Sequence, residues 1–493
     1  MIKISNKYIK IIFFLAFLSS NVFAKVNNRT LYVPMPDLPV SVDPIKSLDV
    51  FSNNLIRQIH RGLFKITKSG LPEPDLISSF KIDKSGLLYS FQLAENKFSN
   101  NIDLESKHVK QSIERAIRSK FNGYQRLSCL KGFKNILNGK SSELNGIKIL
   151  NKKEFLLDLN CKITRLPYIL SDLKLSIILN DTSPEIGLGP YKLAKRSDKN
   201  VDLVLVSETS ENIFSQISYI KRTEKEIDTE IKNNPEMNFL IFSYSNISNI
   251  VDKNLKFETM RSWSNYLVAV NSNRIKSKKQ RNEIVRLIKK EELVKACYPG
   301  NIVDNNIIPF GFRGYVKDLN YELPEKNKNE KISNLHSNVV IINGVGSEEC
   351  LKKNLRSQLG SNSKIEIQSA EVAINDWIKN KTDIIFFYLE SELNLDVFQF
   401  LTLESDFFLG DKSDKSIQMD LDVLQNLDNL AEYNKIATEF QKKIILNGLL
   451  VPLFIPRSKI IYSSTIDLPD FGMIPPTYIN FSELKFKTNK VRQ

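Results

Sequence analysis

The stretch from Ser41 to Arg115 contains, in order, Ser41-Val-Asp-Pro44, Asn53-Asn54, Gly62-Leu-Phe64, Gly70-Leu-Pro-Glu-Pro-Asp-Leu76, Ser79-Phe-Lys-Ile-Asp83 and Gly86-Leu-Leu-Tyr-Ser-Phe-Gln-Leu93. Apolar residues recur every fourth position at its start, at Phe51, Leu55, Ile59 and Leu63. That spacing places them on one face of a helix, and Gly62 is suited to ending it. The short apolar run that follows predicts a strand, and the prolines after Gly70 exclude a helix there.

The next part of the stretch changes to an alternating pattern. Apolar residues alternate at 80–82 and again at 87–93, and turn residues separate the two runs. This pattern predicts a β-hairpin. Val109, Ile113 and Ile117 then return to helical spacing. The stretch therefore predicts a mixed α/β structure, in which most of these residues are core or turn positions.

The same mixture of strands and helices continues to the end of the chain. Gly187-Leu-Gly-Pro-Tyr191 predicts a tight turn, and no Gly-Lys-Ser/Thr follows it, so it is not a phosphate-binding loop. Periodicity predicts strands at 201–206, 266–271, 339–342, 364–367, 383–388 and 449–454, and helices at 281–297, 348–359 and 431–447. Residues 339–367 form a β-α-β unit, for which a right-handed parallel crossover is expected.

The order of these elements resembles the extracytoplasmic solute-binding proteins of the dipeptide/oligopeptide type, family 5. In that family a Gly-x-Gly-Pro-Tyr segment stands at the place of Gly187–Tyr191, and an Asn that closes a strand precedes an Arg that opens a helix, as Asn271 and Arg281 do here. The resemblance runs from about Leu31 to Leu484. It implies an α/β, two-lobed periplasmic binding protein fold (type II, cluster C-like), with mixed sheets flanked by helices and a ligand cleft between the lobes.

The resemblance also implies a division of the chain. Residues 25–262 would form the first lobe, with an extra subdomain at about 77–180. The second lobe would span 263–464, and residues 465–493 would return to the first lobe.

The first 24 residues have the features of a secretory signal peptide. Lys3, Lys7 and Lys10 precede an apolar run at 11–18 that is too short to span a bilayer, and Val22-Phe-Ala24 suits cleavage after Ala24. No cysteine lies near this position, so we expect no lipid anchor. We therefore expect a periplasmic protein.

The formal net charge is +14, and it falls to +11 without the three lysines of the signal peptide. Basic residues are spread along the chain among Asp and Glu, with no basic helix interleaved with aromatic residues and no zinc-finger spacing. Nucleic acid is therefore not expected as a partner. A basic surface remains compatible with anionic components of the cell envelope.

Four cysteines permit two disulfides in an exported chain, and three pairings are open. We favour Cys129–Cys161, because both fall in one predicted lobe, which leaves Cys297–Cys350. Buried free thiols are the alternative.

Enzymatic function has little support in the sequence. The three histidines lie far apart, no close pair of metal ligands is present, and no Gly-x-Ser-x-Gly segment occurs. We expect no catalytic residues, no metal and no cofactor.

The resemblance implies a periplasmic substrate-binding component of an ABC transporter. It would act as a monomer that binds short peptides or a related amine-bearing solute and delivers it to permease subunits.

The family's ammonium-binding acid follows the strand at 383–388. This chain has Tyr388-Leu-Glu-Ser-Glu392 there, so Glu390 or Glu392 would take that role, although the usual Asp-Pro pair is missing. The expected ligand-binding residues are Trp263, Tyr266 and Tyr388 as aromatic walls, Asn271 and Arg281 as a polar contact or lobe support, and Glu390 and Glu392. The alternative is a transport-inactive envelope binding or scaffold protein with the same fold.

Overall fold

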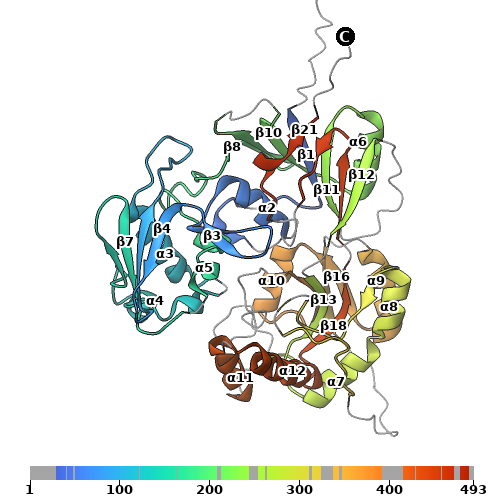
Figure 1. The fold of residues 1–493 in the computed structure, drawn as a ribbon. Helices are drawn as coiled ribbons and strands as arrows, with labels where there is room; N and C mark the ends of the chain where they lie inside the picture. The colour runs from blue at the N-terminus through green and yellow to red at the C-terminus, as the bar shows by residue number, and fades with distance from the viewer. Residues whose placement is uncertain are drawn as a thin grey trace, which may run out of the picture.

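The computed structural model describes residues 29–487 except 40, 48–49, 122, 164, 208–211, 244–253, 261–263, 310–311, 313, 324–336, 344–346, 391–414, 428, 457 and 471–477. The predicted signal peptide, residues 1–24, lies outside this part. Three sheets of four or more strands organise the described chain, and helices flank them (Figure 1). No helix within the described ranges combines the length and apolar character needed to cross a membrane.

The first large sheet is built around three parallel strands. β1 (Thr30–Met35) is central and pairs in parallel with β10 (Gln216–Lys221) and β11 (Asn238–Ser243). Four antiparallel strands extend the sheet to the order β12-β19-β11-β1-β10-β9-β8; they are β8 (Tyr191–Arg196), β9 (Asn200–Leu205), β12 (Leu255–Met260) and β19 (Ser458–Ser463).

Both faces of this sheet are covered by helices. α2 (Val50–Ile59) packs Leu55, Ile56 and Ile59 against one face. α6 (Glu224–Asn233) packs Ile227 and Ile231 against the other. Burial on both faces explains why the central strands are almost continuously apolar rather than alternating.

The second large sheet has the order β14-β18-β13-β17-β15-β16. Every residue of β13 (Ser264–Val270) is buried, because this strand lies inside the sheet and is covered on both faces. The predicted β-α-β unit is confirmed as β15 (Asn338–Ile342), α9 (Glu348–Leu359) and β16 (Lys364–Gln368), with β15 and β16 parallel. The remaining strands are β14 (Ile302–Val303), β17 (Ile384–Glu390) and β18 (Leu450–Ile455).

Two groups of three helices cover this sheet. α7 (Lys278–Leu287), α8 (Lys290–Cys297) and α9 share the core of one face. α10 (Ala370–Ile378), α11 (Lys415–Asn426) and α12 (Leu430–Leu446) share the core of the other. The sheet and its helices therefore form three layers.

The single helix expected at 281–297 is wrong, because the chain leaves the helix at Ile288, which is extended (φ −80°, ψ 94°). An unbroken helix would continue its buried stripe from Ile284 and Ile288 onto Glu291 and Glu292, and burying unpaired carboxylates is costly. The break restores Leu293 and the following apolar residues to the core.

The chain passes between the two large sheets twice. β12 ends at Met260 and β13 begins at Ser264, while β18 ends at Ile455 and β19 begins at Ser458. We expected the chain to return by about residue 465, and β19, which begins at Ser458, pairs with β11 and β12 of the first large sheet.

A third sheet stands apart beside α2 (Figure 1). Its order is β4-β5-β7-β6, and its strands are β4 (Ile77–Ile82), β5 (Leu88–Leu93), β6 (Ile147–Ile149) and β7 (Glu154–Asp158). β4 and β5 are the predicted hairpin. α3 (Ser106–Ser119), α4 (Phe133–Leu137) and α5 (Leu166–Ile169) share the core of this sheet. A two-stranded ribbon of β2 (Phe64–Ile66) and β3 (Pro72–Pro74) leads into it.

Both favoured disulfides are present. Cys129 and Cys161 join two loops of the region around the four-stranded sheet, about residues 77–180, which we call the small-sheet region; their Cα atoms are 5.2 Å apart. Cys297 and Cys350 join the end of α8 to α9, with Cα atoms 5.6 Å apart. Each bond closes a loop within one region, so it restricts the unfolded chain locally.

The glycines of Gly187–Tyr191 lie directly against the end of α2. The Gly189 amide donates to Ile59 O at 2.7 Å. A Cβ at residue 187 would lie 2.0 Å from Ile59 O, and one at residue 189 would lie 2.3 Å from Gln58 O. The segment therefore requires glycine because two backbones approach closely, and this contact holds the start of β8 against the end of α2.

We expect Gly189→Ala to lower the free energy of unfolding by about 3 kcal/mol, because the added Cβ forces backbone atoms apart. Gly139→Ala is the matched control, since nothing lies within 4 Å of a Cβ there and only the left-handed conformation (φ 67°) is penalised, by about 1 kcal/mol. Denaturant unfolding of both variants measures the difference. Equal losses would contradict the close-contact interpretation.

His60, at the end of α2, predicts a pH dependence of stability. Burial lowers its pKa from 6.5 to about 4, with Asp43 opposing this change and Arg115 adding to it. The unfolded chain therefore accepts a proton that the folded protein resists. The contribution of neutral His60 to the free energy of unfolding is fully present above pH 6.5. It is lost as the pH decreases toward 4, by about 3 kcal/mol. Unfolding of His60→Gln between pH 7 and pH 4 should show a shallower slope than that of the parent protein; identical slopes would refute the assignment.

Candidate functional site

The carboxyl ends of the parallel strands in the two large sheets face the same linkers. In the first sheet, Ser243 at the end of β11 pairs with Lys459, next to the return linker. In the second, Glu390 at the end of β17 pairs with Ser264, next to the outgoing linker. β1 and β10 run parallel to β11, and β15 and β16 run parallel to β17. The two carboxyl edges are therefore directed toward each other.

Each sheet also reverses its winding at the central parallel strand. The chain goes from β1 to β10 on one side and then to β11 on the other. It likewise goes from β15 to β16 and then to β17, with α9 on one face and α10 on the opposite face. Loops that leave neighbouring strands toward opposite faces open a crevice at the carboxyl edge, and α/β proteins bind ligands there. The candidate site therefore lies between the carboxyl ends of β1 and β15.

Four aromatic rings pack together beside this edge of the second sheet. Tyr266 on β13 lies opposite Tyr388 on β17, with ring centroids 4.7 Å apart. Tyr298 and Phe454 pack against each other at 4.6 Å and against Tyr266. Tyr266 is fully buried, so it is a core residue that supports the site rather than an exposed wall, whereas Tyr388 is only partly buried.

Two tyrosines of this cluster, Tyr266 and Tyr298, are held in the neutral form. Burial raises the pKa of Tyr266 well above its usual value, and Tyr298, Tyr388 and Glu348 add to the increase. Burial and Glu348 raise the pKa of Tyr298 in the same way. Because Tyr266, Tyr298 and Phe454 are buried, the cluster is an uncharged core beside the edge, and Tyr388 is its only partly buried ring.

Asn271 and Arg281 lie at the opposite end of β13. Five residues of strand, about 17 Å, separate Asn271 from Tyr266. Asn271 Nδ2 donates to Thr382 O at 3.1 Å. Arg281 is buried, and its Nε donates to Asn447 O at 2.9 Å while Nη1 donates to the carbonyls of residues 275 and 276. Of the two roles expected for these residues, their contacts match support of the fold.

Of the other expected site residues, Trp263, Glu390 and Glu392, the structure describes only the backbone of Glu390. Trp263 and Glu392 lie outside the described residues. The backbone of Glu390 ends β17 at the carboxyl edge, but its side chain is not described. The acid that would meet a ligand therefore stays a prediction.

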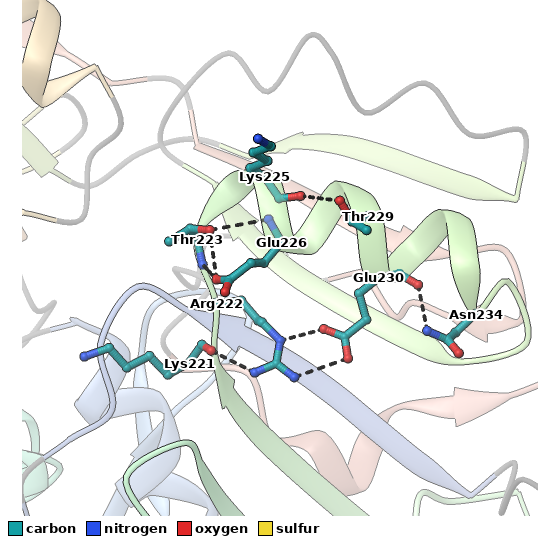
Figure 2. Close-up of polar contacts among 8 residues, drawn as sticks. All are labelled: Lys221, Arg222, Thr223, Lys225, Glu226, Thr229, Glu230 and Asn234. Atoms are coloured by element: carbon teal, nitrogen blue, oxygen red, sulfur yellow. Dashed lines mark hydrogen bonds and ion pairs between the residues drawn. The ribbon is translucent and has the colours of Figure 1, made fainter.

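The edge of the first sheet carries two cations that sequence reasoning missed. Arg222, just after β10, donates from Nε to Glu230 Oε2 at 2.6 Å and from Nη2 to Glu230 Oε1 at 3.3 Å (Figure 2). Lys221 pairs with Asp37 at 2.6 Å. Both cations are neutralised by acids of the same region, so they fix the edge rather than confer a net charge on it.

The start of α6 at this edge was recognisable in the sequence. Thr223 and Glu226 form a capping box, in which the Glu226 carboxylate accepts from the Thr223 amide at 2.7 Å (Figure 2). The Thr-x-x-Glu spacing is the sequence sign of such a helix start. Among the described residues, no three His, Cys, Asp or Glu side chains lie close enough together to hold a metal ion.

Solved structures with the same architecture are numerous, although no protein-family model and no curated protein matches the chain. The substrate-binding domain of an oligopeptide ABC transporter from Bacillus anthracis is 14% identical, with a TM-score of 0.78 over 94% of this chain and 99% of that one. The murein tripeptide binding protein MppA of Escherichia coli is 14% identical, with a TM-score of 0.77 over 93% and 98%. NikZ of Campylobacter jejuni, in complex with Ni(L-His), is 17% identical, with a TM-score of 0.73 over 93% and 100%.

The chain has the two-lobed fold of these binding proteins. The predicted fold class is thereby confirmed. The seven-stranded sheet belongs to one lobe and the six-stranded sheet to the other, and the candidate site lies where the lobes face each other.

We expect Arg281→Met to lower the free energy of unfolding by about 3 kcal/mol, because it leaves buried carbonyl oxygens without their charged donor. Arg281→Lys is the control, since it keeps the charge and can still donate to part of this set. Thermal or denaturant unfolding measures both. A methionine variant as stable as the parent would show that Arg281 does not support the fold.

Proposed function

We propose that this protein is the substrate-binding component of an ABC transporter. It binds a short peptide or a related amine-bearing solute between its lobes and delivers it to permease subunits in the membrane. The observation that carries the proposal is the pair of facing carboxyl edges, each with its own switch point, in a fold shared with transport-associated binding proteins. The proposal includes export to the periplasm after cleavage at Ala24, and action as a monomer.

The lobe boundaries are part of the same proposal. We assign residues 25 to about 260 to the first lobe, with the small-sheet region at about 77–180 as its subdomain. The second lobe extends from about 263 to Ile455, and the rest of the chain returns to the first lobe.

The linkers support binding by lobe closure. Next to them, Met260 pairs with Ser458 on one side and Tyr266 pairs with Phe454 on the other, so the strand ends that flank the two linkers are adjacent in both sheets. Two adjacent short linkers permit bending about one axis, and hinges of this kind need only a few residues to change conformation. A ligand that contacts both edges stabilises the closed form by its differential affinity.

The ligand chemistry rests on the end of β17. Tyr388, the partly buried ring of the aromatic cluster, would provide an aromatic wall, and Glu390 or Glu392 would provide a carboxylate for an ammonium group. A charge-assisted hydrogen bond in a closed site is strong, whereas the same carboxylate without a cation would be penalised by desolvation. The similar structures are named for an oligopeptide transporter, a murein tripeptide and a nickel–histidine complex, so the fold alone leaves the ligand open.

Two measurements test the function. Native mass spectrometry of protein taken from its own periplasm should show a retained small molecule. Calorimetric titration of the ligand-free protein with a library of dipeptides and tripeptides should then give saturable heats for a subset. No retained molecule together with no heat from any peptide would refute the peptide proposal and favour the transport-inactive scaffold protein.

We expect either Glu390→Gln or Glu392→Gln to weaken binding of a confirmed amine-bearing ligand by roughly 10- to 100-fold, since a hydrogen bond to a charged group contributes about 1.5–3 kcal/mol. Glu371→Gln is the matched control, an exposed acid of α10 on the same lobe. Affinity is measured by the same calorimetry. Unchanged affinity in both variants would remove the acid assignment while leaving the binding function intact.

A further inference from the structure

The positive charge of the chain is concentrated in the small-sheet region. Residues 77–180 contain 18 Lys and Arg against 9 Asp and Glu, so this region supplies +9 of the total +14. The rest of the chain, almost four times longer, is nearly balanced. An asymmetry of this size indicates an interaction with an anionic partner.

Within this region the charge gathers around the edge strand β6. Residues 118–148 contain seven basic residues and one acid, Glu143. Six of the basic side chains are exposed and define what we call the β6 patch: Arg118, Lys120, Lys131, Lys134, Lys140 and Lys148. α4 and the following loop precede β6, and the end of α3 contacts that loop through a bond from Arg118 Nη1 to Ser142 O at 3.1 Å. The small-sheet region stands to one side of both large sheets (Figure 1).

Nearby acids neutralise the β6 patch only in part. Lys131 and Lys148 share one carboxylate, Asp158, at 2.6 and 2.8 Å. Glu143 is paired with Lys110 at 2.6 Å. Within the described part of the chain, Lys120, Lys134 and Lys140 have no ion pair. The patch therefore keeps a net positive charge that is available to a partner.

Exposed apolar side chains adjoin these basic residues. Ile149, the last residue of β6, and Leu150, which follows it, are 44% and 55% exposed. Lys148 precedes them, and Lys152 and Lys153 follow. A protruding apolar pair surrounded by lysines suits the boundary between lipid headgroups and acyl chains, where the apolar groups enter and the amines meet phosphates.

We propose that the β6 patch is a docking surface for a bilayer that contains anionic phospholipids. A soluble polyanion would satisfy the lysines but offers no layer in which Ile149 and Leu150 can be buried. Docking would keep the protein close to the membrane, orientated by its small-sheet region and with the lobes turned away. The inference goes beyond the proposed function and rests neither on the ligand nor on a permease.

The test measures binding of the purified exported protein to vesicles of phosphatidylcholine, alone or with about one third phosphatidylglycerol. We expect binding only to the anionic vesicles, with a strong decrease at high salt, because salt screens the attraction. Lys120→Gln, Lys134→Gln and Lys140→Gln together should weaken binding roughly 100-fold, since each basic residue near an anionic surface contributes about fivefold. None of the three has an ion pair in the described chain, so the fold should be retained.

A second triple variant provides the matched control. Lys192, Lys195 and Lys199 are exposed lysines on β8 and the turn to β9, far from the β6 patch in the chain. Their replacement by glutamine changes the total charge equally and should leave vesicle binding unchanged. Equal losses in the two triple variants would show a nonspecific charge effect and overturn the proposal.

Replacing the apolar pair separates lipid from other polyanions. Ile149→Ser with Leu150→Ser should weaken binding to anionic vesicles several-fold and leave binding to soluble heparin unchanged. Two results would overturn the lipid proposal: equal binding to neutral and anionic vesicles, or vesicle binding that does not change in this double variant.

Discussion

The pairing of strands on both sides of the linkers is the constraint on which the rest of the structure depends. β12 pairs with β19 and β13 pairs with β18, so the strand ends next to the two linkers are adjacent in both sheets. Each large sheet therefore presents its linker edge to the other. If either pair were lost, the carboxyl ends of β1 and β15 would no longer be held facing each other. The position of the candidate site is thus a consequence of backbone hydrogen bonding near the linkers more than of any single side chain.

Local patterns in the sequence predicted the elements well. The helix at α2, the β4–β5 hairpin and the β15-α9-β16 unit all follow from periodicity, which depends on near neighbours. The break between α7 and α8 was also present in the pattern, because Glu291 and Glu292 fall where a continuous helix would bury them. It was missed because apolar residues are frequent throughout the segment, and their number drew attention away from the shift in their helical spacing after Ile288.

The site was predicted less well, for a physical reason. Asn271 and Arg281 resemble site residues in sequence, yet Asn271 donates to a carbonyl more than 100 residues away, and Arg281 adds to two local carbonyls one that lies more than 160 residues away. No local pattern reports such partners. Charge was misread in a similar way: basic residues appear mixed with acids along the whole chain, but most of the excess, +9 of +14, belongs to the small-sheet region.

The insertion of β19 between β11 and β12 has a consequence for how the chain matures. These two strands have no direct pairing and are joined only through a strand that begins at Ser458, close to the end of the chain. The C-terminal segment then attaches to α2, where Gln58 Nε2 donates to Ile479 O at 2.8 Å and Gln58 Oε1 accepts from the Phe481 amide at 2.9 Å. The first lobe therefore cannot complete its sheet until β19 has been synthesised, so sheet completion comes late, after the strands of the second lobe.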